Sequence, residues 1–248
     1  MLAQALSIFF MKLSVGICPW LSLISIQDTG KSFFRLLMFL SFSSMILGIW
    51  AGPRSPDLIR VLYGLVTFSI YCFLGRYQPK KMDRYWVLLF ILGSLVIGFE
   101  AFQLSDEKTG VIFVNMLLGA LLLGSGLTSM VLGHWYLIRP GLSFHFLIRA
   151  AGIFFVMAAV RMIWVMAMLS KFGQGSLWEV IQNAGDILFL TRFLWGGALP
   201  LFFVVFAYRC AKIHSNRSAT GILYFSTASL FMGELLADYL TLMSRIPI

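Results

Sequence analysis

The stretch VIFVNMLLGALLLGSGLTSMVLGHWYLI, residues 111–138, decides the fold class of this chain, because it contains no Asp, Glu, Lys or Arg. A helix of about 20 apolar residues is enough to cross the hydrocarbon core of a bilayer. The uncharged stretch is longer than that, so we expect a membrane-spanning helix that tilts to fit its length. The sequence on both sides of it follows the same pattern.

Seven more apolar stretches flank this segment, each bounded by charged residues. The predicted spans are about 3–26, 36–53, 61–77, 85–102, 111–138, 150–170, 187–208 and 220–243. The span 61–77 is the weakest, because only 15 residues separate Arg60 from Arg76. The longest connection, 171–186, is predicted to hold a small helix at the membrane interface. We expect one all-α domain, 1–248, that forms a polytopic transmembrane bundle of about eight helices.

The composition supports this class. Hydrophobic residues make up 60% of the chain and charged residues 12%, with a mean hydropathy of +0.89, whereas a soluble domain carries about 25% charged residues. The net charge of +9 would suggest nucleic acid as the partner of a soluble protein. In a membrane protein, Lys and Arg in the loops set the topology and meet anionic lipid. We therefore expect membrane lipids and other membrane subunits as partners, and no nucleic acid.

The loop charges predict an orientation. The loops that follow the first, third, fifth and seventh spans hold eleven basic residues: Lys31, Arg35, Arg76, Lys80, Lys81, Arg84, Arg139, Arg149, Arg209, Lys212 and Arg217. The opposite side holds five: Arg54, Arg60, Lys108, Lys171 and Arg245. Because cytoplasmic loops carry the excess of Lys and Arg, both termini are predicted on the outer side. The expected location is the bacterial cytoplasmic membrane.

Charged residues also fall inside the predicted spans. The last span contains GILYFSTASLFMGELLADYL (221–240), in which Glu234 and Asp238 lie one helical turn apart. Arg161 falls near the middle of its span and Arg192 near the outer end of the next. Charges at such depths are costly, so they face the interior of a bundle and pair with one another. We expect these four side chains to form a polar network.

Two interpretations of this network stay open. In the first, the arginines only neutralise the two acids and hold the helices together. In the second, the network lines a cavity in which Glu234 or Asp238 carries protons and an arginine holds an anionic or carbonyl group. Glu100, close to the end of its span, joins the list of network candidates, although we expect it to reach water at the interface.

Histidine and glycine patterns add further candidates. His134 lies near the inner end of its span and is a weak haem-ligand candidate, because it also fits an interfacial role beside two aromatic residues. Gly119, Gly126 and Gly133 recur every seven residues and are predicted to let helices pack closely. The sequence GGALP (196–200) is expected to weaken the seventh span just inward of the network. No metal-spaced cluster of ligands is found, so no metal site is predicted.

These features leave three functions open. With about eight helices and an acidic GELLADYL (233–240) in its last span, the chain resembles the quinol-interacting membrane anchor subunits of polysulfide-reductase type. That resemblance implies a subunit of an electron-transfer complex, with a quinone as ligand and its redox centres in other subunits. It carries no family residue onto a numbered position here. The alternatives are a small transporter or channel and a non-catalytic scaffold or assembly subunit, and whether the chain is an enzyme stays undecided.

Overall fold

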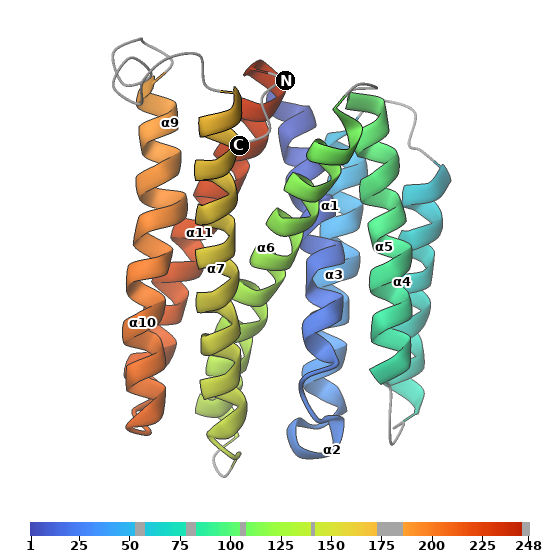
Figure 1. The fold of residues 1–248 in the computed structure, drawn as a ribbon. Helices are drawn as coiled ribbons and strands as arrows, with labels where there is room; N and C mark the ends of the chain where they lie inside the picture. The colour runs from blue at the N-terminus through green and yellow to red at the C-terminus, as the bar shows by residue number, and fades with distance from the viewer. Residues whose placement is uncertain (53–57, 78–82, 105–107, 140–141, 173–185, 245–248) are drawn as a thin grey trace.

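A computed structural model of the chain describes residues 1–52, 58–77, 83–104, 108–139, 142–172 and 186–244. Every regular element in these ranges is a helix, and eight helices are long and apolar enough to cross a membrane. The predicted fold class, an all-α multi-pass membrane bundle, is confirmed (Figure 1).

The described residues form ten α-helices. They are α1 (Leu2–Leu21), α2 (Ile26–Thr29), α3 (Lys31–Ala51), α4 (Leu58–Arg76), α5 (Asp83–Leu104), α6 (Thr109–Ile138), α7 (His145–Phe172), α9 (Asp186–Phe193), α10 (Leu199–Lys212) and α11 (Asn216–Ser244). A π-helical segment, η1 (Leu194–Ala198), joins α9 to α10. These three pieces contribute a single membrane span.

Several helix boundaries differ from the predicted ones: α3 begins at Lys31 rather than near 36, α7 at His145 rather than near 150, and α11 at Asn216 rather than near 220. The first helix ends at Leu21 rather than near residue 26, because Ser22 closes it by donating from its hydroxyl to the carbonyl of Pro19 at 2.6 Å. Helix α4, which corresponds to the predicted span 61–77, begins at Leu58. It therefore includes Arg60, which the sequence interpretation placed in a loop. The interfacial helix expected within 171–186 falls mostly on residues 173–185, outside the described residues.

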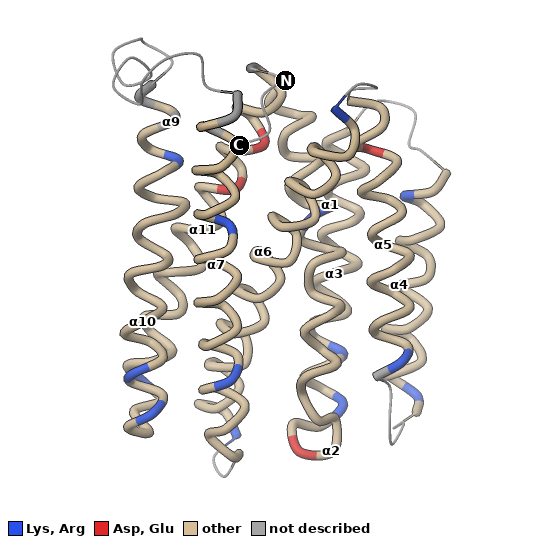
Figure 2. The backbone as a smooth tube through the Cα atoms, viewed as in Figure 1, with Lys and Arg blue, Asp and Glu red and all other residues tan. Residues whose placement is uncertain are grey.

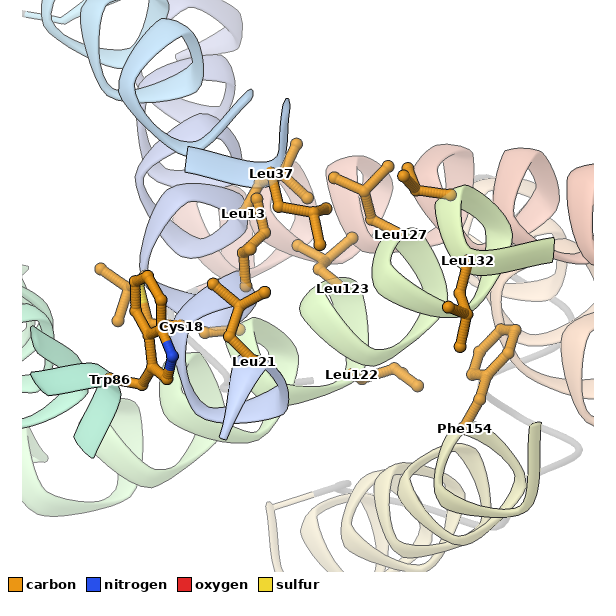
Figure 3. Packing of buried hydrophobic residues seen from close by; sticks show 14 of the residues in the cluster. Leu13, Cys18, Leu21, Leu37, Trp86, Leu122, Leu123, Leu127, Leu132 and Phe154 are labelled. Atoms are coloured by element: carbon orange, nitrogen blue, oxygen red, sulfur yellow. The ribbon is translucent and has the colours of Figure 1, made fainter. Parts of the chain in front are cut away.

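Helix α6 lies at the centre of the bundle and packs against α1, α5, α7 and α11. Leucines of α1 and α6 belong to the apolar core, and Phe154 of α7 and Trp86 of α5 pack at the two sides of them (Figure 3). The start of α1 and the end of α11 lie at the same end of the bundle (Figure 1). Segments from the two ends of the sequence are thereby brought together.

Glycines allow two pairs of helices to approach to backbone contact. A Cβ atom added at Gly124 of α6 would lie 1.8 Å from the carbonyl oxygen of Gly16 in α1. A Cβ added at Gly233 of α11 would lie 1.9 Å from the Cα of Gly196 in η1. Close backbone approach gives membrane helices van der Waals contact where lipid supplies no hydrophobic driving force. These two contacts fix α1 and η1 against the helices that carry the site.

Charge is distributed unevenly along the bundle. Figure 2 shows most Lys and Arg positions at the end that holds α2, opposite the termini. Acidic positions within the long helices lie closer to the other end. This asymmetry agrees with the division of the loops into a basic side and a less basic side.

Candidate functional site

The acids of α11 meet a lysine from the first helix. Glu234 and Asp238 are 0% and 5% exposed, and their four-residue spacing places them on one face of α11. Lys12 of α1 lies between them, with its Nζ 3.0 Å from Glu234 Oε2 and 2.7 Å from Asp238 Oδ1. The sequence interpretation placed Lys12 inside a span but did not assign it to these acids.

Two arginines approach Glu234 from the other side. Arg161 of α7 places its Nε 2.9 Å from Glu234 Oε1 and its Nη2 3.3 Å from Oε2. Arg192 of α9 places its Nη2 3.4 Å from Glu234 Oε1. Cationic side chains from α1, α7 and α9 therefore surround the carboxylate of Glu234 in α11. We call Lys12, Arg161, Arg192, Glu234 and Asp238 the charge cluster.

Asn115 of α6 holds Arg161 in place. Its side-chain oxygen accepts hydrogen bonds from Arg161 Nη1 and, at 3.1 Å, from Trp164 Nε1. Arg161 Nη1 also donates to the main-chain carbonyl of Asn115 at 3.2 Å. The sequence interpretation missed Asn115, although a lone amide in a 28-residue stretch without charges was a signal that could have identified it.

Gly119 of α6 makes room for the cluster. A Cβ atom at this position would lie 2.6 Å from Glu234 Oε2 and 2.9 Å from Lys12 Nζ. Any side chain here would push apart the ion pair that joins α1 to α11. The glycine therefore serves the geometry of the site as well as the approach of helices.

The other glycines of this series also face polar residues of α11. Thr227 Oγ1 donates to the carbonyl of Gly126 at 3.2 Å, and a Cβ at Gly133 would lie 3.0 Å from Thr220 Oγ1. Along the two helices, positions 119, 126 and 133 thus oppose positions 234, 227 and 220 in register. A repeat of seven residues keeps one face of each helix in contact with the other, as in coiled coils. The polar residues of α11 form a continuous seam against α6.

The cluster has unused hydrogen-bonding capacity. With every group ionised it contains three cations and two carboxylates, a formal charge of +1. Among the described residues, Arg192 Nε, Arg192 Nη1 and Asp238 Oδ2 are buried and have no hydrogen-bond partner. Buried polar groups in proteins are nearly always paired with protein or ordered water. The cluster therefore has two buried donors and one buried acceptor that no described protein group satisfies.

Glu100 belongs to a second buried ion pair, away from the cluster. It is 3% exposed rather than solvated at the interface, and its carboxylate pairs with Arg60 Nη2 of α4. Arg60 Nη1 donates to Ser7 Oγ at 2.9 Å, and Ser7 Oγ in turn donates to the carbonyl of Gly48 at 2.7 Å. The expectation that Glu100 reaches water is wrong, because Arg60 lies inside α4 and meets it there.

The three histidines lie away from the charge cluster and from the Arg60–Glu100 pair. His134 is exposed on the surface of the bundle, with its ring 6.3 Å from that of Tyr224. His145 and His214 are also exposed. Within the described residues no group of three or more His, Cys, Asp or Glu side chains is arranged to hold a metal ion.

An apolar groove lies on the outer surface of the helices that carry the cluster. It has a volume of about 440 Å³ and runs between α9, η1 and α11. Its wall includes Thr191 and Trp195 on one side and Met232, Leu236 and Tyr239 on the other. The neighbours of Thr191 and Gly233 in the chain, Arg192 and Glu234, point into the bundle instead. The groove and the cluster thus share the same pair of helices.

Comparison with protein-family models, with curated proteins and with solved structures finds no match to this chain.

Proposed function

We propose that this chain is the membrane subunit of an electron-transfer assembly and that the charge cluster contacts a quinone head group or the protons that it exchanges. The observation that carries the proposal is the unused capacity of the cluster: two free donors on Arg192, one free acceptor on Asp238 and a formal charge of +1. A purely structural ion-pair network would be expected to satisfy its own groups.

The chemistry of a quinone complements these groups. A quinone carbonyl accepts hydrogen bonds, which the guanidinium of Arg192 can donate. A quinol hydroxyl donates one, which Asp238 Oδ2 can accept. Glu234 is held by three cations, whereas Asp238 has Lys12 as its one ion-pair partner among the described residues. Asp238 is therefore the better candidate to take a proton, and Glu234 fixes the cations around it.

The apolar groove fits the rest of such a ligand. Quinones carry long isoprenoid chains, and the wall of the groove is built mainly from Leu, Met and Trp side chains. Because the groove shares α9 and α11 with the cluster, an apolar tail bound in it would lie against the helices that carry Arg192 and Asp238. In this proposal the redox centres that exchange electrons with the quinone belong to partner subunits.

The location follows from the charge pattern. We place the protein in the bacterial cytoplasmic membrane, with the basic end of the bundle in the cytoplasm, since this end holds the excess of loop Lys and Arg. The cluster then lies in the outer half of the membrane. Protons released there would reach the outer side.

The proposal is tested by purification from native membranes in mild detergent, followed by extraction of quinone and mass spectrometry of the subunits retained. We expect redox subunits and bound quinone with the wild-type protein. We expect the quinone content to fall in Arg192→Gln and to stay unchanged in Arg209→Gln, which removes an exposed arginine from α10. Quinone content that is equal in both variants, or absent from the wild type, would refute the proposal.

A second function, transport of a small anion, is favoured by one observation. The span that carries Arg192 is interrupted by the π-helical segment η1, and transporters often bind substrates where a helix is broken. Liposomes that contain only this protein would then take up anions, and Arg192→Gln would abolish uptake. A protein without uptake activity leaves the quinone proposal as the working hypothesis.

A further inference from the structure

A hollow at the basic end of the bundle has the character of a binding site. It has a volume of about 380 Å³ and lies between the start of α3 and the end of α6. Gly30, Lys31 and Ser32 line one side, and Trp135, Ile138 and Arg139 line the other. It lies at the opposite end of the bundle from the charge cluster and does not depend on the function proposed for that cluster.

Arg139 is held in position across this hollow. Its Nη1 donates to the carbonyl of Thr29 at 3.0 Å, and the indole of Trp135 donates to the same carbonyl at 3.1 Å. Gly30 has a φ of 83°, a conformation that L side chains rarely adopt, and a Cβ there would lie 2.6 Å from Arg139 Nη1. The turn between α2 and α3 is therefore shaped around the guanidinium.

The positive charge of the hollow is not neutralised by the protein. Among the described residues, no carboxylate forms an ion pair with Lys31 or Arg139. Asp28 is the one acidic residue in α2 and is exposed. Because α3 begins at Lys31, the positive end of its dipole adds to the field in the hollow. An anion bound here would contact cations that have no acid of their own.

The position favours a lipid over a free ion. Ile138 is exposed on the rim of the hollow, and Trp135 is the amphipathic residue type found at membrane interfaces. Basic hollows between membrane helices at this level bind the head groups of anionic lipids. We infer that this hollow binds the phosphate of an anionic phospholipid, with Lys31 and Arg139 contacting the phosphate oxygens and the acyl chains lying along the end of α6.

Native mass spectrometry of the purified full-length protein with added phosphatidylglycerol tests the inference. One Lys or Arg near the membrane surface contributes about 1 kcal/mol to the attraction of anionic lipid. Arg139→Gln and Lys31→Gln are therefore each expected to weaken phosphatidylglycerol binding about fivefold. Arg217→Gln, which removes an exposed arginine from the start of α11 at the same end of the bundle, should leave binding unchanged.

Two further measurements separate the alternatives. Lys31 makes no described side-chain hydrogen bond or ion pair, so Lys31→Gln tests the hollow without disturbing the fold. Inorganic phosphate should fail to displace phosphatidylglycerol if the acyl chains contribute, whereas ready displacement would show a site for free phosphate and overturn the lipid assignment. Equal binding by Arg139→Gln, Lys31→Gln and Arg217→Gln would overturn the site itself.

Discussion

The two buried ionic groups of this protein differ in how completely their polar atoms are used. In the pair of Arg60 and Glu100, no buried side-chain polar atom of either residue lacks a partner among the described residues, and Ser7 extends the pair to the carbonyl of Gly48. In the charge cluster, Arg192 has two buried donors without a partner and Asp238 has one such acceptor.

In our proposal, this difference separates an ion pair that only joins helices from a cluster that also binds a ligand. The Arg60 pair connects α4 to α5, and the hydrogen bonds from Arg60 to Ser7 and from Ser7 to Gly48 extend this connection to α1 and α3. The charge cluster also joins helices, but it contains one more cation than carboxylates. Arg192 and Asp238 also keep buried polar atoms that have no partner among the described residues. A buried polar network that is only partly satisfied by the protein is costly, and in our proposal the ligand satisfies the remaining groups. Substitutions that act differently on the two groups test this distinction.

The largest effect is expected at Glu234. Replacing it by Gln leaves Lys12, Arg161 and Arg192 with Asp238 as the single remaining carboxylate, so the cluster carries a formal charge of +2 within the bundle. Breaking a buried pair by removing one partner costs about 3–5 kcal/mol. We expect a loss of this size in the unfolding free energy of the Glu234→Gln protein in detergent. A change below about 1 kcal/mol would mean that the cluster is hydrated in solution and stabilises the bundle little.

A smaller loss is expected when Glu100 is replaced. In Glu100→Gln the amide keeps the shape of the side chain, and Arg60 retains its hydrogen bond to Ser7. Removing one partner of a buried ion pair costs about 3–5 kcal/mol, and we expect a loss near the lower end of this range because one cation loses its carboxylate here, against three in Glu234→Gln. Thermal unfolding under the same conditions should therefore place Glu100→Gln between the wild type and Glu234→Gln. The reverse order would contradict the comparison between the two groups.

The sequence predicted the cluster better than it predicted the second pair. The predicted spans gave each charged residue a depth in the membrane. The two acids of α11 fell at a depth similar to that of Arg161 and Arg192, so a network between them could be predicted. Lys12 is 222 residues away from Glu234 in the chain, and nothing in a single sequence indicates which helices are neighbours. Lys12 was therefore missed as the residue between the two acids.

Arg60 shows a different kind of error. The predicted span 61–77 was delimited by the charged residues on its two sides, so Arg60 was treated as the end of that helix. The structure places Arg60 in α4, where it pairs with Glu100, and α4 begins at Leu58, three residues before the predicted start at 61. The eight-helix fold was robust to this error, because each segment was still long and apolar enough to be recognised.

Gly119 offers a more selective way to disturb the cluster. Gly119→Ala would place a methyl group 2.6 Å from Glu234 Oε2 and 2.9 Å from Lys12 Nζ, so it forces this ion pair apart while all charges remain. Forcing an extra methyl group into a packed interior costs about 1–3 kcal/mol. Because the displaced atoms are side-chain ends, we expect a loss of about 1 kcal/mol in detergent unfolding. Gly221→Ala in α11, where nothing lies within 4 Å, is the matched control and should cost nothing.

The smallest effect is expected when both members of the Arg60 pair are removed together. Replacing a buried ion pair by apolar residues of similar volume is often neutral, because the cost of desolvating both charges disappears with the pair. In Arg60→Leu/Glu100→Leu, Ser7 keeps its hydrogen bond to the carbonyl of Gly48, so the Ser7 hydroxyl is not left without a partner. We expect unfolding within about 1 kcal/mol of the wild type, and therefore a double variant more stable than Glu100→Gln alone. An additive loss in the double variant would show that the Arg60 pair does more than join helices, and the contrast with the charge cluster would no longer hold.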